Sequence, residues 1–212
     1  MTNPENHAPY QPKQDFLRVA TASPEVAIGH VSTNLLRMKE LYDKAVQQNT
    51  SLVVFPELSL TGYTIQDLVG TPSLLNAAKQ GLIEFAALTE NKQAAAVVGL
   101  PFVAGNATYN CAAVLSEGEI RGIVPKQNLP MYNEFYEKRW YQAWDNSRPN
   151  IEVTIGNKKV PFGTQQLFEI NDQLMGIEIC EDLWVPRQPS TELSANGATI
   201  IANPSASPET VT

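Results

Sequence analysis

Apolar residues recur in two distinct patterns along the first half of the chain. Continuous apolar runs predict strands at residues 17–26, 51–57 and 94–102. The run at 51–57 is typical of a strand buried on both faces. Between these runs, apolar side chains recur at helical spacing over 35–46 and 75–86, and Ser32 is the expected N-cap of the first helix. Alternating strands and helices predict an α/β protein with layered sheets.

The second half of the chain is dominated by hairpin patterns. Paired strands are predicted around turns at Glu117-Gly118, Gly156-Asn157 and Asn171-Asp172. A short helix near 190–196 then precedes an apolar strand at 198–203. A helix would normally follow such a strand to cover the sheet, so we expect a fold that is incomplete at its C-terminus.

Composition narrows the class of protein. The 212 residues are 43% hydrophobic and 17% charged, which suits one globular domain with a sizeable core. A net charge of −7 and the lack of a dense basic cluster argue against nucleic-acid and anionic-membrane partners. Residues 1–15 are polar and proline-rich without a signal-peptide pattern, which predicts a flexible arm or an oligomer contact. Two cysteines make no disulfide framework, so a reducing, cytoplasmic location is expected.

Three reactive side chains each follow a predicted strand. Glu57 follows the run at 52–56, Lys126 follows "GIVP" and Cys180 follows "MGIEI". Polar groups just beyond the carboxyl ends of buried strands are where sites assemble in α/β sheets. A thiol nucleophile, a carboxylate base and an ammonium that stabilises an oxyanion form a workable set for acyl transfer.

Each of these residues also has an ordinary structural explanation. Cys180 could be a buried strand cysteine, Glu57 a loop carboxylate and Lys126 a solvated surface lysine. For Cys111, in the middle of "NCAAV", the structural explanation is favoured. Carboxylates around Cys180 should raise the thiol pKa, and a regular pleat would place Glu178 on the same face as the thiol.

Three separated motifs resemble those of the nitrilase, or carbon–nitrogen hydrolase, superfamily: "VVFPELSLTGY" (53–63), "PKQNLPMYNEFYEKRWY" (125–141) and "GIEICEDLWVP" (176–186). Three shorter motifs are more specific: "LPMYNEFYEKRW", "ICEDLW" and "NPSASP". They resemble the glutaminase domain of glutamine-dependent NAD(+) synthetases, in the longer bacterial form. The resemblance extends from about Arg18 to the C-terminus.

The resemblance implies a four-layer α-β-β-α sandwich and a role for each matching residue. Glu57 would be the general base, Lys126 the oxyanion-stabilising cation and Cys180 the nucleophile. Glu137 would be a supporting carboxylate. The residues that the resemblance places around a glutamine substrate are Tyr132, Glu181, Ser207 (in preference to Ser205) and Tyr63. Aromatic packing remains the alternative for the two tyrosines, and a turn contact for the serines.

The resemblance also implies partners. Residues 16–212 would form a truncated glutaminase domain, and ammonia would pass to a separate synthetase domain that amidates deamido-NAD with ATP and magnesium. No cofactor or metal is expected in this chain, and the family suggests a homo-oligomer. Two alternatives remain open: a stand-alone amidase acting on another small amide, and a non-catalytic fragment.

Overall fold

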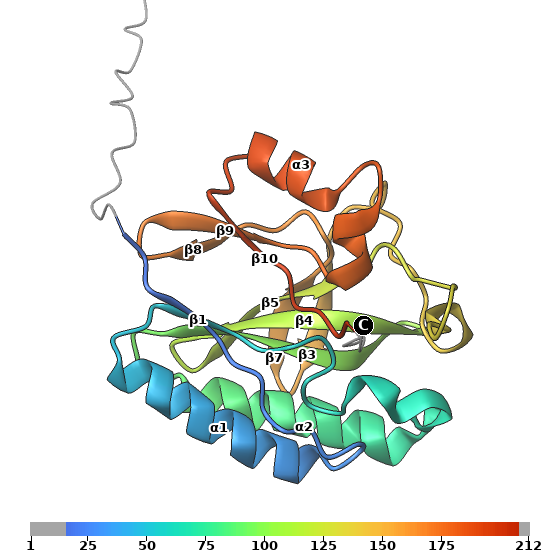
Figure 1. The fold of residues 1–212 in the computed structure, drawn as a ribbon, viewed down its shortest axis with the longest axis horizontal. Coiled ribbons are helices and arrows are strands. Elements are labelled where there is room, and N and C mark those ends of the chain that lie inside the picture. The colour runs from blue at the N-terminus through green and yellow to red at the C-terminus, as the bar shows by residue number, and fades with distance from the viewer. Residues whose placement is uncertain (1–15, 208–212) are drawn as a thin grey trace, which may run out of the picture.

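The computed structural model describes residues 16–207, so the N-terminal arm expected at 1–15 lies outside the described part of the chain. Two β-sheets form its centre (Figure 1). The described helices are α1 (Val31–Gln47), α2 (Pro72–Leu88) and α3 (Pro189–Ala195), with short 3₁₀ segments η1 (Tyr63–Gly70), η2 (Glu137–Arg139) and η3 (Cys180–Trp184).

The larger sheet has seven strands in the described residues, in the order β1-β2-β3-β4-β5-β7-β6. Its first three strands are parallel, β3, β4 and β5 pair antiparallel, and the β6–β7 hairpin joins β5 through a parallel contact. The strand bounds are β1 Val19–Thr21, β2 Leu52–Val54, β3 Ala95–Ala104, β4 Ala107–Ser116, β5 Glu119–Pro125, β6 Ile151–Ile155 and β7 Lys158–Phe162.

The smaller sheet has the order β10-β9-β8 within the described chain. β8 and β9 form an antiparallel hairpin, and β10 pairs parallel to β9. The bounds are β8 Phe168–Ile170, β9 Gln173–Ile177 and β10 Ile200–Ala202.

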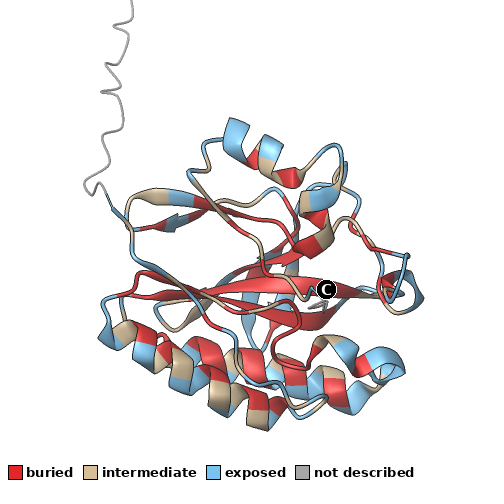
Figure 2. Ribbon diagram, in the orientation of Figure 1, coloured by how far each residue is buried: buried red, intermediate tan, exposed pale blue. Residues whose placement is uncertain are grey.

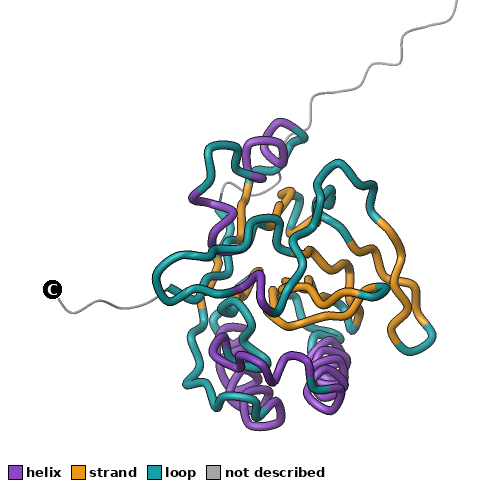
Figure 3. The backbone as a smooth tube through the Cα atoms, turned by 90° about the vertical axis from the view of Figure 1, so that its right-hand side faces the viewer, coloured by secondary structure: helices purple, strands orange, loops and turns teal. Residues whose placement is uncertain are grey.

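The layers follow the order helix, sheet, sheet, helix. Helices α1 and α2 cover one face of the larger sheet, the smaller sheet covers the opposite face, and α3 packs on the outside of the smaller sheet (Figures 1 and 3). This arrangement confirms the four-layer α-β-β-α sandwich that the family resemblance implied.

The continuous apolar runs are explained by two cores, one on each side of the larger sheet. On β3, Ala96 and Val98 belong to the core under the helices, whereas Ala95 and Val97 belong to the core between the sheets. Both faces of this strand therefore pack against a core, and Figure 2 shows the central strands almost wholly buried. Each fully buried Val or Leu stabilises the fold by roughly 1.5–3 kcal/mol.

Several local predictions are confirmed and others corrected. The turns at Glu117-Gly118 and Asn171-Asp172 have the positive φ values of tight hairpins. The predicted cap at Ser32 is wrong, because α1 begins at Val31 with His30 as N-cap. The strand predicted to begin at 51 is regular only over Leu52–Val54, since the chain turns after it at Pro56. No helix within residues 16–207 combines the length and hydropathy required to cross a bilayer.

Candidate active site

Lys126 lies at the centre of a buried ionic cluster, directly after β5. Its ammonium donates to Glu57 Oε1 at 2.6 Å and to Glu137 Oε1 at 2.7 Å, and its side chain is 0% exposed. The solvated surface lysine that the sequence left open is therefore wrong. A buried charge of this kind needs opposite charges and hydrogen bonds around it, and the two glutamates supply both.

The pKa values in the cluster reflect this arrangement. Burial by itself would lower the pKa of Lys126, but attraction to Glu57 and Glu137 raises it overall, so the ammonium stays charged. Burial raises the pKa of Glu137, and Lys126 opposes that shift. The cluster thus holds a fixed cation between two buried carboxylates.

Asn110 on β4 is a member of this cluster that sequence reasoning missed. Its Nδ2 donates to Glu57 Oε1 at 2.7 Å and to Glu137 Oε2 at 3.4 Å. Its Oδ1 accepts no hydrogen bond from the described residues, although the side chain is fully buried. The available signal was an amide directly before the apolar run 111–115 of β4, where an unpaired polar group is costly.

Tyr63, at the start of η1, is partly buried against Phe135. Its hydroxyl donates to Glu137 Oε1 at 2.7 Å. Burial and the neighbouring Glu137 charge raise the pKa of Tyr63, so the hydroxyl keeps its proton and remains a donor. The structure therefore places Tyr63 against the second glutamate, while its role in lining a substrate pocket remains a prediction.

Cys180 begins the 3₁₀ turn η3 in a strained backbone conformation. Its φ is 46°, a region that residues other than glycine seldom adopt and that is common at functional sites. Its backbone N–H donates to the Pro204 carbonyl at 3.1 Å. Burial raises the pKa of the thiol, the charge of Glu57 raises it further, and Lys126 opposes both effects. Glu57 thus lies near enough to influence the thiol, which rests in its neutral form.

The carboxylate beside the thiol is not the one that the strand pattern indicated. Regular pairing of β9 ends at Ile177, so the assumption that the pleat continues to Cys180 fails. Glu178 accepts hydrogen bonds from Ser190 N at 3.0 Å and Asn203 Nδ2 at 3.4 Å. The expected rise in the thiol pKa is confirmed, and its electrostatic source is Glu57.

The predicted glutamine-binding residues surround the cluster nearer the surface. The Tyr132 hydroxyl donates to Glu181 Oε2 at 2.6 Å, and the Tyr132 side chain is about half exposed. Ser207 is exposed, whereas Ser205 donates to Asn203 Oδ1 at 2.6 Å. The Ala206 N–H, just before Ser207, donates to Glu57 Oε2 at 3.1 Å. The segment that follows β10 therefore contacts the Glu57 carboxylate directly.

Gly99 on β3 makes room for the turn that carries Glu57. A Cβ atom at Gly99 would lie 2.3 Å from Leu58 N and 2.5 Å from Pro56 O, both rigid backbone atoms. Only glycine permits this approach, so Gly99 fixes how closely Glu57 can sit to β3. Sequence patterning gave no sign of this contact, because it joins segments far apart in the chain.

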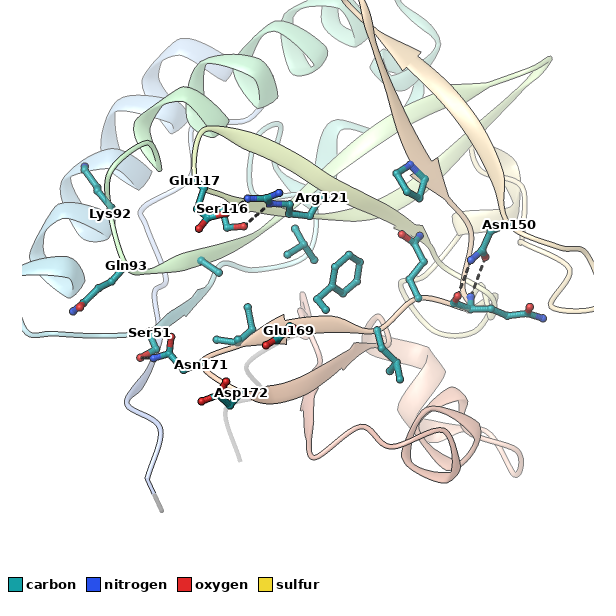
Figure 4. A pocket seen from close by; sticks show the side chains of 18 residues that line it. Ser51, Lys92, Gln93, Ser116, Glu117, Arg121, Asn150, Glu169, Asn171 and Asp172 are labelled. Carbon is teal, nitrogen blue, oxygen red and sulfur yellow. Dashed lines mark hydrogen bonds and ion pairs between the residues drawn. The ribbon is translucent and has the colours of Figure 1, made fainter. Parts of the chain in front are cut away.

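A cavity of about 940 Å³ lies elsewhere in the fold. It lies between the sheets, and its lining includes Glu117 and Asp172, which precede β5 and β9 (Figure 4). Lys126 and Cys180 follow the opposite ends of those strands. Within residues 16–207, no three His, Cys, Asp or Glu side chains are grouped so that they could share a metal ion.

Comparison with curated proteins places this chain among relatives of greater length. The glutamine-dependent NAD(+) synthetase of Mycobacterium tuberculosis is 38% identical over 199 residues, which is 92% of this chain and 29% of that protein. The enzyme of the same name from Thermotoga maritima is 36% identical, over 91% of this chain and 30% of the relative. The chain thus spans less than one third of the length of these relatives.

Solved structures agree on the fold. A glutamine-dependent NAD(+) synthetase from Cytophaga hutchinsonii superposes with a TM-score of 0.80 at 29% identity, covering 90% of this chain and 30% of that one. An amidase from Nesterenkonia sp. superposes with a TM-score of 0.69 at 18% identity, covering 89% and 64%. The model of the carbon–nitrogen hydrolase family matches residues 18–212. On its sequence match and its sandwich fold, this chain belongs to the carbon–nitrogen hydrolase family.

Proposed function

We propose that this chain is the glutamine-hydrolysing part of a glutamine-dependent NAD(+) synthetase. The observation that carries the proposal is the buried ion pair of Lys126 with Glu57, whose charges both act on the Cys180 thiol, in a chain 38% identical over 92% of its length to a relative bearing that name. The thiol, the base and the cation lie in one site, as acyl transfer from an amide requires.

The proposed reaction begins with a proton transfer from Cys180 Sγ to Glu57. The thiolate attacks the side-chain carbonyl carbon of glutamine, a C–S bond forms, and the carbonyl oxygen becomes an oxyanion. Lys126 Nζ and the Glu181 N–H are the proposed donors to that oxyanion. Glu57 returns its proton to the amide nitrogen, the C–N bond breaks and ammonia leaves.

The second half of the reaction reuses the same base. Glu57 accepts a proton from water, the resulting hydroxide attacks the thioester, and glutamate leaves as the thiol recovers its proton. Hydrogen bonds from Lys126 and Asn110 to Glu57 Oε1 hold that carboxylate in place during both proton transfers. Glu137 supports the ammonium from its other side.

Four residues are proposed to contact the substrate. Glu181, paired with Tyr132, would face the positively charged α-amine of glutamine, and Ser207 would add a hydroxyl from the segment beside Glu57. Tyr63 would line the pocket through its ring while its hydroxyl holds Glu137. We also propose that the protein acts in the cytoplasm as a homo-oligomer, with ATP and magnesium bound by a separate synthetase domain that amidates deamido-NAD.

Ammonia release from a panel of amides tests this proposal. The chain should hydrolyse glutamine in preference to asparagine, acetamide and propionamide, and the Cys180→Ala variant should release no ammonia. Equal rates across the panel would favour a stand-alone amidase instead. If glutamine hydrolysis survived in Cys180→Ala, the proposed nucleophile would be wrong.

The alternative of a non-catalytic fragment is tested by covalent labelling. Incubation with a diazo-ketone analogue of glutamine, followed by intact-mass measurement, should give one adduct per chain, and Cys180→Ala should give none. Cys111 is an internal control for specificity, because it is 1% exposed in the core under the helices. An unlabelled parent chain would support the inert fragment.

A further inference from the structure

A second buried carboxylate, Asp182, collects hydrogen bonds from two separate segments. It is 1% exposed. Its Oδ1 accepts from Asn128 N at 2.8 Å, Asn128 Nδ2 at 2.9 Å and Gln127 N at 3.2 Å. Its Oδ2 accepts from Ile179 N at 3.0 Å. Four N–H groups therefore converge on one side chain that lies outside the Lys126 cluster.

The donors directly flank two of the proposed catalytic residues. Gln127 and Asn128 follow Lys126, and Ile179 precedes Cys180. Lys126 extends from β5 in the larger sheet, whereas Cys180 follows β9 in the smaller sheet. The Asp182 carboxylate thus links two segments, one from each sheet. The segment after β5 carries the cation, and the segment after β9 carries the thiol.

A carboxylate suits this position better than any neutral side chain. Its two oxygens accept all four N–H groups, whereas an amide has one accepting oxygen and would turn an NH₂ group against a donor. The bond to Ile179 N also closes the first turn of η3, as an N3 acid does at a helix start. That turn holds Cys180 at its strained φ of 46°.

We propose that Asp182 is a positioning residue that sets Cys180 Sγ in register with Glu57 and Lys126. The inference rests on the proposed glutaminase chemistry and adds a residue that acts through others. Loss of the bridge lets the two segments shift, and a displacement of about 1 Å in a reacting group costs about 100-fold in rate. Binding of the glutamine α-amine, proposed for Glu181 and Ser207, should change much less.

The test compares Asp182→Asn with a matched control, Glu178→Gln. Glu178 is also 1% exposed and accepts two hydrogen bonds, but both come from outside the segments 126–128 and 179–180. We expect Asp182→Asn to lower kcat for glutamine about 100-fold with KM within about threefold of the parent. Glu178→Gln should keep kcat within about threefold of the parent. This holds even if its thermal unfolding midpoint falls as far as that of Asp182→Asn.

Two further measurements keep the inference falsifiable. If Asp182→Asn does not fold, Asn128→Ala removes one of the four donors and should lower kcat about three- to tenfold without changing KM. Alkylation of Cys180 by iodoacetamide should be faster in Asp182→Asn than in Glu178→Gln, because a thiol displaced from Glu57 is less exposed to the charge that raises its pKa. Equal kcat losses in the two carboxylate variants at equal stability, or a loss confined to KM, would overturn the positioning role.

Failure of the inference and failure of the proposed function give different results. If the parent chain hydrolyses glutamine and Asp182→Asn matches Glu178→Gln, the function stands and the positioning role is wrong. If the parent chain does not hydrolyse glutamine, the proposed function fails, and the alkylation rates alone decide the role of Asp182. Equal alkylation rates in the two variants would then refute it.

Discussion

Substitution of Gly99 by alanine should disable the site without touching a reactive group. The added Cβ would sit 2.3 Å from Leu58 N, whereas ordinary contacts of this kind begin at 3.4 Å. Since β3 is held between β2 and β4, the turn at 56–58 must yield, by about 1 Å. A shift of that size in a general base costs about 100-fold in kcat, and overpacking costs about 1–3 kcal/mol of unfolding free energy.

The assay for this prediction pairs steady-state glutamine hydrolysis with urea unfolding. Gly81→Ala is the matched control, because its Cβ would meet the movable side chain of Val31 at 2.9 Å in the core under the helices. That variant should keep kcat within about threefold of the parent, since only the packing of α2 against α1 changes. A folded Gly99→Ala protein with the parental kcat would refute the claim that close approach at Gly99 positions Glu57.

Three further predictions concern charge. Lys126→Met leaves Glu57 and Glu137 buried without their cation, so unfolding free energy should fall by about 3–5 kcal/mol in urea titrations, and a loss below about 1 kcal/mol would contradict the buried ion pairs. Burial raises the pKa of Asp182 to about 6 from 3.8, so the folded state favours its protonated form. The contribution of this group to stability, about 3 kcal/mol, is therefore present below pH 4 and lost as the pH rises through about 6. The parent should lose stability relative to Asp182→Asn over that interval, and parallel pH profiles would contradict the shift. Finally, Glu57→Gln should lower the pKa of Cys180, visible as a downward shift in the pH midpoint of iodoacetamide alkylation, whereas an unchanged midpoint would remove Glu57 as the source of the shift.

The sequence indicated the fold and the three central residues for physical reasons that remain valid in the structure. Strands buried on both faces read as continuous apolar runs, and β3 is such a strand because two cores flank it. Glu57, Lys126 and Cys180 follow β2, β5 and β9, so the strand ends predicted three side chains that the fold brings near one another.

Residues whose contacts join segments far apart in the chain were harder to predict from the sequence. Asn110 is a polar exception inside β4, and its partners are 53 and 27 residues away along the chain. Gly99 matters because a distant turn lies against it, which no local pattern records. Asp182 looked like one of several acidic neighbours of the thiol, but its carboxylate is engaged with Gln127, Asn128 and Ile179. Local spacing cannot distinguish a solvated acid from one that bridges two sheets.

The most direct test of the central claim is to trap the acyl-enzyme. The chain is mixed with glutamine, quenched in acid within its first turnovers and measured as an intact protein, with peptide mapping of the modified site. The account predicts a glutamyl thioester on Cys180 that is absent from Cys180→Ala and that disappears as glutamate and ammonia are released. Turnover of glutamine without an adduct on Cys180, or with one on another residue, would contradict it.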